Sequence, residues 1–161
     1  MFAGLYIHIP FCVNKCPYCD FYSITDTSLH PAFLDALITE MQSIDHEGLL
    51  FDTLYIGGGT PSVLDVTSME RIIESAHRWY PIDTEPEITV EVNPDAVTRE
   101  QLKGYQRVGI NRINIGIQSF QSNNLRFLKR SHSVGDINPA ITWAVKAGFE
   151  KLGLDLIYGI P

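Results

Sequence analysis

The chain has few positive charges and no long hydrophobic run. Its 161 residues include 12 Lys and Arg against 19 Asp and Glu, a formal net charge of −7. This balance leaves no positive field for a polyanion, so we expect no nucleic-acid partner. No apolar run approaches the ~18 residues of a membrane span. No basic residue precedes Lys15, so we expect no signal or transit peptide and a cytoplasmic location.

Cysteine is also scarce, and all three residues fall within one eight-residue stretch, at Cys12, Cys16 and Cys19. An odd number so closely spaced cannot form a disulfide framework. Three thiolates with the spacing CxxxCxxC suit zinc, copper(I) or an iron–sulfur cluster. A zinc site would need a fourth ligand from a second CxxC or HxxxH pair, which the sequence lacks, although His8 or Asp20 could complete it. The spacing therefore favours a cluster over zinc.

The length suits one domain with its own core. β-branched or aromatic-rich runs alternate with segments of helical period. The predicted strands are residues 5–9, 53–56, 88–92, 111–117 and 154–158. The predicted helices are residues 31–44, 67–80, 98–107, 122–130 and 134–147, the second opened by a Thr67/Glu70 capping box. This alternation predicts an α/β fold with a parallel sheet, open or curled into a barrel.

The predicted strands alternate between aliphatic and polar residues, whereas parallel strands covered on both faces usually read as continuous apolar runs. In the third strand Ile88, Val90 and Val92 share one face, and Thr89 and Glu91 share the other. If helices cover the aliphatic face, the polar face lines an interior that holds polar ligands. A half-solvated antiparallel sheet would show the same alternation, but the helical connections argue against it.

Chemically notable residues follow the strands at one end. The cysteines follow the first strand and the glycine triplet 57–59 follows the second. The notable residues at or near the ends of the other strands are Glu91, Asn93, Gln118 and Asp155. The triplet lacks the spacing of GxGxxG and the Lys of a P-loop, so taken alone it is a tight turn. Barrels and open α/β sheets place their sites at the carboxyl ends of strands. We therefore expect a site at that edge.

Five motifs, in order and along essentially the whole chain, resemble those of the radical S-adenosylmethionine (radical SAM) superfamily, specifically the oxygen-independent coproporphyrinogen III oxidase-like family. They are LYIHIPFC with CPYCDFY (5–22), GGGTP (57–61), EVNP (91–94), NIGIQSF (114–120) and DLIYGIP (155–161). The resemblance implies a TIM-like partial (β/α)6 barrel, of which about five βα units are present. It also implies that residues 1–161 form a core domain that stops before the sixth strand and before a C-terminal substrate or haem domain.

The same resemblance implies that Cys12, Cys16 and Cys19 hold a [4Fe–4S] cluster whose fourth iron binds S-adenosylmethionine (SAM). One electron, from a donor such as a flavodoxin or ferredoxin, then cleaves the sulfonium of SAM. Thiolate-rich ligation favours the low potential that this reduction requires. The positions that match SAM contacts of the family are Tyr6, Tyr18, Gly58, Gly59, Thr60, Glu91, Gln118, Arg130 and Asp155.

These positions imply separate roles in SAM binding. Gly58, Gly59 and Thr60 match contacts to the methionyl amino group, Gln118 and Asp155 match contacts to the ribose, and Tyr18 matches the aromatic residue near adenine. Tyr6 matches a residue beside the sulfonium, and Arg130 matches a carboxylate-binding arginine. Glu91 would face a ligand ammonium or a ribose hydroxyl. Two simpler interpretations remain, a surface Glu91 on an edge strand and an Arg130 that ends a helix.

Phe21 stands where the oxidases of the family carry a fourth cysteine, two residues beyond Cys19. The sequence therefore resembles more closely the haem chaperone branch, whose members bind haem and pass it to acceptor proteins. We expect a haem carrier with a SAM-liganded cluster, its haem contacts lying beyond Pro161. The alternatives are an oxidase that decarboxylates coproporphyrinogen III and a structural zinc module.

Overall fold

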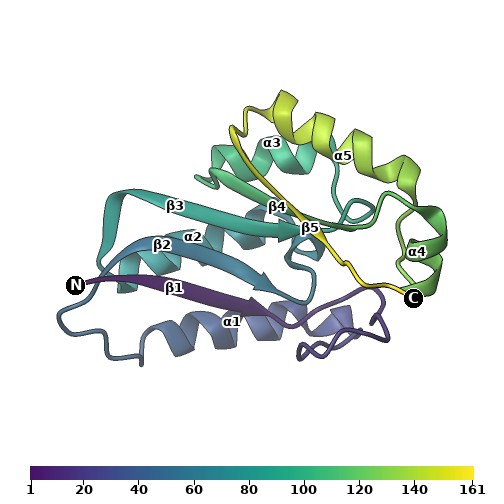
Figure 1. Cartoon of the computed structure of the whole chain (residues 1–161). Helices are drawn as coiled ribbons and strands as arrows, with labels where there is room; N and C mark the ends of the chain where they lie inside the picture. The colour runs from purple at the N-terminus through teal and green to yellow at the C-terminus, as the bar shows by residue number, and fades with distance from the viewer.

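Five parallel strands form one sheet in the order β1-β2-β3-β4-β5 in the computed structural model, which describes residues 1–161. The strands are β1 Phe2–Ile9, β2 Leu50–Gly58, β3 Ile82–Val92, β4 Arg112–Gln118 and β5 Lys151–Leu156. Every strand pairs in parallel with the next one along the chain (Figure 1). The predicted parallel α/β sheet is therefore confirmed.

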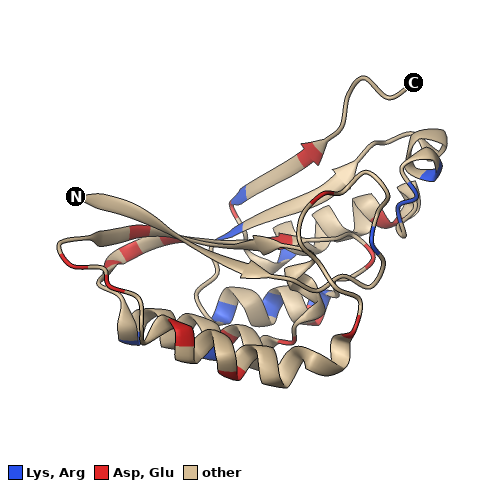
Figure 2. Ribbon diagram, turned by 90° about the horizontal axis from the view of Figure 1, so that it is seen from below, with Lys and Arg blue, Asp and Glu red and all other residues tan.

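Helices connect the strands and lie on one side of the sheet, which leaves the other side open (Figure 2). They are α1 His30–Met41, α2 Val66–Trp79, α3 Arg99–Arg107, α4 Ser122–Phe127 and α5 Val134–Ala147, with 3-10 turns η1 Thr27–Leu29 and η2 Pro61–Val63. α1, α2, α3 and α5 pack side by side in that order. None of these helices has the length and apolar content needed to span a bilayer.

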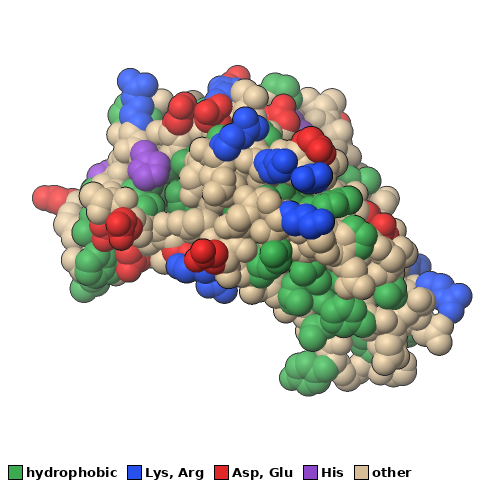
Figure 3. Space-filling model, turned by 90° about the horizontal axis from the view of Figure 1, so that it is seen from above, with side chains coloured by type: hydrophobic (Ala, Val, Ile, Leu, Met, Phe, Trp, Pro, Cys, Tyr) green, Lys and Arg blue, Asp and Glu red, His purple; other side chains and the backbone are tan.

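The aliphatic face of the sheet packs under the helices and forms the core. Val90 and Ile113 in neighbouring strands are fully buried, as is Ile56 in β2. The polar face of the same strands points to the open side, as the alternation predicts. β5 differs, because Leu154 and Leu156 on its aliphatic face are 43% and 60% exposed. Figure 3 shows apolar side chains gathered at the lower right of the molecule as seen from above.

Some predicted boundaries are wrong. β5 begins three residues earlier than expected, because Lys151 pairs with Arg112 although its side chain is not apolar. The helix predicted over residues 122–130 ends at Phe127. The Thr67/Glu70 capping box does not form. The side chain of Asp65 instead accepts a hydrogen bond from the backbone N–H of Ser68. Its negative charge also interacts favourably with the positive end of the α2 dipole.

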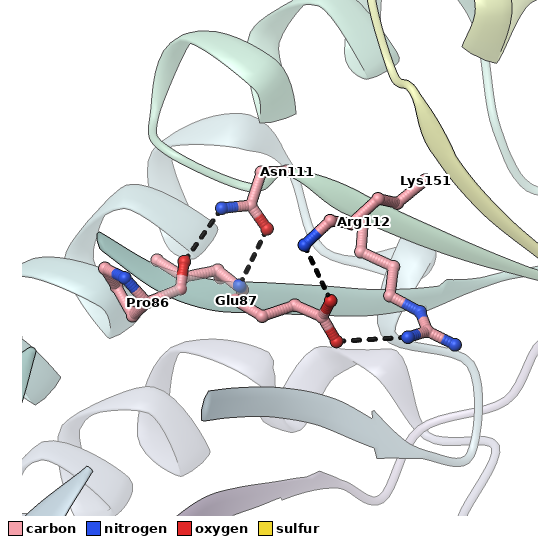
Figure 4. A network of polar contacts seen from close by, with 6 residues as sticks. Pro86, Glu87, Asn111, Arg112 and Lys151 are labelled. Carbon is pink, nitrogen blue, oxygen red and sulfur yellow. Dashed lines mark hydrogen bonds and ion pairs between the residues drawn. The ribbon is translucent and has the colours of Figure 1, made fainter. Parts of the chain in front are cut away.

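Polar contacts tie three strands together at the amino end of the sheet (Figure 4). The amide of Asn111 accepts from the N–H of Ile88 at 2.9 Å and donates to the carbonyl of Pro86 at 2.8 Å. The carboxylate of Glu87 pairs with Arg112 at 3.1 Å and with Lys151 at 3.0 Å. Each charged group of this network therefore has a partner of opposite charge within the protein.

The contact between α2 and α3 provides a test of the packing. A Cβ at Gly104 would overlap a methyl of Val66, whose β-branched side chain cannot easily turn away. Gly104→Ala would gain up to about 1 kcal/mol of helix propensity. Overpacking costs about 1–3 kcal/mol, so we expect a net loss in the free energy of unfolding, measured by urea denaturation.

The matched control is the Val66→Ala background, where the clashing methyls are absent. There Gly104→Ala should be neutral or stabilising, since only the helix propensity remains. An equal loss in both backgrounds would show that the α2/α3 contact is not the cause.

Candidate functional site

The loop after β1 presents three free cysteines at the carboxyl end of the sheet. Its base is closed by backbone hydrogen bonds from Cys12 to the carbonyl of Ile24 at 2.9 Å and from Ile24 to that of Pro10 at 2.7 Å. A turn closes with Cys19 N–H donating to the carbonyl of Cys16 at 3.1 Å. Cys12 is buried and the other two are half-buried. The loop therefore holds its thiols against the sheet.

Two adjoining pockets bring together all but one of the predicted site residues. The first, of about 60 Å³, is lined by all three cysteines. The second, of about 150 Å³, is lined by Gly58, Glu91, Gln118 and Asp155. The residues common to both pockets are Tyr18, Cys19, Gly59, Thr60, Asn93 and Arg130. A group bound by the cysteines would therefore adjoin a ligand in the polar pocket.

Tyr6 is the exception and lines neither pocket. It is 53% exposed and stacks on Tyr55 with ring centroids 5.9 Å apart. Its hydroxyl lies 3.3 Å from Nδ1 of His8, whose Nε2 lies 2.9 Å from the carbonyl oxygen of Tyr22 in the cysteine loop. In this structure Tyr6 contacts the residues that support the site.

The arrangement of the thiols bears on which inorganic group they could hold. No group of three or more His, Cys, Asp or Glu side chains in the structure is close enough to ligate one metal ion. A tetrahedral zinc site draws its ligands around a single ion. In an iron–sulfur cluster each thiolate binds a different iron, so the ligands need not converge. The three thiolates that line one pocket are a donor set that fits an iron–sulfur cluster.

The glycine triplet packs directly against the cysteine loop. A Cβ at Gly59 would lie 2.6 Å from the carbonyl oxygen of Phe11 and 3.0 Å from the sulfur of Cys12, so no larger residue fits. The N–H groups of Gly59 and Thr60 donate to the carbonyls of Ile9 at 2.8 Å and Phe11 at 2.7 Å. The carbonyl of Gly59, which accepts no hydrogen bond within the protein, is left for a ligand with N–H donors, such as an amino group.

Glu91 lies on the polar face of β3 and points into the second pocket. Its carboxylate accepts hydrogen bonds from the hydroxyl of Tyr55 at 2.7 Å and from the N–H of Gly58 at 3.1 Å. Burial raises the pKa of Glu91 above its usual value, and these two hydrogen bonds offset the rise only in part. A cationic or hydrogen-bond-donating ligand would stabilise the charged form.

Arg130 reaches the cysteine loop from beyond α4. The left-handed conformation of Lys129, with φ +50°, turns the chain after the helix. Arg130 then donates to the carbonyl of Gly116 at 3.0 Å, the hydroxyl of Tyr18 at 3.3 Å and the sulfur of Cys16 at 3.7 Å. Its Nε is buried and has no acceptor. Arg130 also forms none of the ion pairs of the structure, so an anionic ligand in the adjoining pocket would find its positive charge unpaired.

The sequence analysis assigned no role to two residues that support this site, although it placed Asn93 on the polar face at the end of its strand. Tyr55 holds Glu91, and Asn93 accepts from Arg130 at 2.8 Å. The available signal was strand alternation, because Tyr55 is in register with Tyr6 and Asn93 lies two residues beyond Glu91. Asp155 lies across β4 from them and accepts from Asn114 at 2.8 Å.

The sequence of this chain is similar to those of known proteins along nearly its whole length. The model of the Radical SAM superfamily matches residues 6–161. The chain is 38% identical to heme chaperone HemW of Synechocystis sp., over 99% of this chain and 40% of that protein. It is 37% identical to HemW of Escherichia coli, over 98% of this chain and 43% of that protein.

A solved structure is also similar over nearly the whole chain. Coproporphyrinogen III oxidase (HemN) from Escherichia coli, described as a radical SAM enzyme, superposes with a TM-score of 0.87 at 30% identity. The match covers 98% of this chain and 37% of that one. The chain thus spans about two fifths of the length of the relatives that it matches.

Replacing each of two glutamates on the polar face of β3 by glutamine should change the free energy of unfolding in opposite directions. The raised pKa of Glu91 means that its protonated form favours the fold, and this stability is lost as pH rises through the folded-state pKa. Glu91→Gln should therefore increase the free energy of unfolding of the ligand-free protein at pH 7.5. The gain should fade at pH 4, where Glu91 is protonated in the parent protein as well.

The matched control is Glu87→Gln. The pKa of Glu87 is lowered, mainly by the hydrogen bond from Lys151 and also by the charge of Arg112. The ionised carboxylate therefore stabilises the fold at neutral pH, and this stability is lost as pH falls. This variant should lose up to about 1 kcal/mol at pH 7.5. Urea denaturation at both pH values measures the two effects, and a loss of stability in Glu91→Gln at pH 7.5 would contradict the assignment.

Proposed function

Since the chain belongs to the radical SAM superfamily, whose members in general use a [4Fe–4S] cluster and SAM, we propose that Cys12, Cys16 and Cys19 hold the cluster and that the adjoining polar pocket holds SAM. The observation that carries this proposal is the adjacency of the two pockets, which share residues of the cysteine loop, the glycine triplet and β3. When bound, the cluster supplies the electron that cleaves the sulfonium of SAM.

The polar groups of the two pockets suit the functional groups of SAM. The carbonyl of Gly59, with Gly58 and Thr60 beside it, would receive the methionyl amino group, and Arg130 would bind the carboxylate. Each charged end of the ligand would then meet a partner of suitable polarity.

The remaining contacts would hold the nucleoside of SAM. Glu91, Gln118 and Asp155 would accept or donate hydrogen bonds at the ribose, with Tyr18 near adenine. For Tyr6 only the family resemblance supports a place beside the sulfonium, because its side chain lies outside both pockets.

Anaerobic reconstitution with iron and sulfide tests the cluster. We expect a broad brown absorption that Cys16→Ala removes, since a thiolate ligand is lost. Val13→Ala is the matched control, because Val13 is an exposed residue of the same loop and should leave the absorption unchanged. A colourless protein that retains zinc would contradict the proposal and favour a structural zinc module.

We further propose that the protein carries haem to an acceptor protein. Two observations support this: the similarity to proteins named heme chaperone HemW, and the exposed Phe21 where the oxidases carry a fourth cysteine. The proposal places the protein in the cytoplasm, with a flavodoxin or ferredoxin as electron donor. The second candidate is decarboxylation of coproporphyrinogen III, favoured by the structural similarity to HemN.

Haem titration of the full-length protein separates the two candidates. A haem carrier should show a saturable shift of the Soret band and no turnover of coproporphyrinogen III under anaerobic conditions with SAM and reductant. Conversion of coproporphyrinogen III without saturable haem binding would favour the oxidase. The cluster assay above is independent of this outcome, because both candidates require the cluster.

A further inference from the structure

An unbroken chain of hydrogen bonds joins two of the three cysteine sulfurs through one side-chain amide. On one side, Asn93 Nδ2 donates to the hydroxyl of Thr60 at 3.3 Å, and that hydroxyl donates to the sulfur of Cys12 at 3.6 Å. On the other side, Asn93 Oδ1 accepts from Arg130 at 2.8 Å, and Arg130 donates to the sulfur of Cys16 at 3.7 Å. Asn93 is therefore the centre of a bridge between Cys12 and Cys16.

We propose that Asn93 is a positioning residue, which directs the hydroxyl of Thr60 and the guanidinium of Arg130 onto the sulfurs of Cys12 and Cys16 and thereby raises the reduction potential of the cluster. This inference rests on the proposed function, because it requires that the cysteines hold an iron–sulfur cluster. Asn93 lines both pockets, but the role assigned to it here is exerted through Thr60 and Arg130.

The chemistry of the bridge requires an amide at this position. Arg130 can only donate, so the oxygen of Asn93 must face it and the NH2 group must face Thr60. The hydroxyl of Thr60 then accepts from the amide, which leaves its hydrogen free to point at Cys12. A carboxylate would reach Arg130 but could not donate to Thr60, and an aliphatic residue could do neither.

Hydrogen bonds of its own backbone hold Asn93 in place. Asn93 follows the last residue of β3, its N–H donates to the hydroxyl of the buried Ser62 at 3.3 Å, and its carbonyl accepts from Ala96 at 3.1 Å. One terminal nitrogen of Arg130, Nη2, donates to both Asn93 and the carbonyl of Gly116, which fixes the plane of the guanidinium. The other terminal nitrogen, Nη1, is thereby directed at the sulfur of Cys16.

Hydrogen bonds to ligand sulfurs affect the two redox states unequally. The reduced cluster carries one more negative charge than the oxidised cluster, so donors to its sulfurs stabilise the reduced state more. The effect is strong where water is scarce, and both Thr60 and Cys12 are buried. Loss of the Asn93 bridge should therefore make the cluster harder to reduce.

The test is a redox titration of the reconstituted protein, followed by absorbance and electron paramagnetic resonance. For Asn93→Ala we expect the ratio of reduced to oxidised cluster at a fixed potential to fall at least tenfold, a shift of about 59 mV for a one-electron couple. Asn111→Ala is the matched control. It also removes an amide with two hydrogen bonds between strands, but at the amino end of the sheet, so the potential should not change.

Thr60→Val provides a second variant of nearly the same shape that removes only the donor to Cys12. We expect a smaller shift of the same sign. If Asn93→Ala assembles the cluster, an unchanged reduction potential would overturn the inference. If Asn93→Ala does not assemble the cluster, an unchanged potential in Thr60→Val would overturn it. Failure of both variants to assemble a cluster would also overturn it, because the role assigned is in the potential and not in assembly. Failure of the parent protein to assemble a cluster would instead contradict the proposed function.

Discussion

The close approach of the glycine triplet to the start of the cysteine loop is the contact on which the rest of the site depends. Ile9 and Gly58 are the last paired residues of β1 and β2, and the hydrogen bonds of Gly59 and Thr60 continue the pairing beyond both strands. A Cβ at Gly59 would collide with the carbonyl of Phe11. The cysteine loop is thus attached to the end of β2 by backbone contacts that only glycine permits.

The two ends of the polar face differ in how completely the protein satisfies its own groups. At the amino end the charges are paired across three strands. At the carboxyl end Gln118 and Lys129 adopt left-handed conformations, at φ +62° and +50°, and Arg130 retains a buried donor without an acceptor. Non-glycine residues keep a left-handed backbone conformation only where the surrounding structure holds them, and such residues cluster at functional sites. Strain and unmet hydrogen bonding therefore mark the same edge that the motifs indicate.

The sequence predicts the layout of this protein better than its contacts. Strand alternation identified the polar face, and the order of motifs placed them at one edge of a parallel sheet, because these properties follow from period and connectivity alone. The position of Arg130 could not follow from either. Helical period carried the predicted helix through residue 130, whereas the chain turns at Lys129 and brings Arg130 to the cysteines. The bridge through Asn93 likewise depends on atoms brought together from four separate segments, which local pattern does not encode.

Glu87 and Glu91 show why residue identity alone does not assign a function. Both lie on the same face of β3, four residues apart. Glu87 has two cationic partners, so its charge is stabilised within the protein and it serves the sheet. Glu91 has two neutral donors and no cation, and burial dominates its pKa. A buried carboxylate without a cation is costly to the fold alone. A ligand with a positive or hydrogen-bond-donating group would offset that cost, and the pocket that Glu91 faces has room for one.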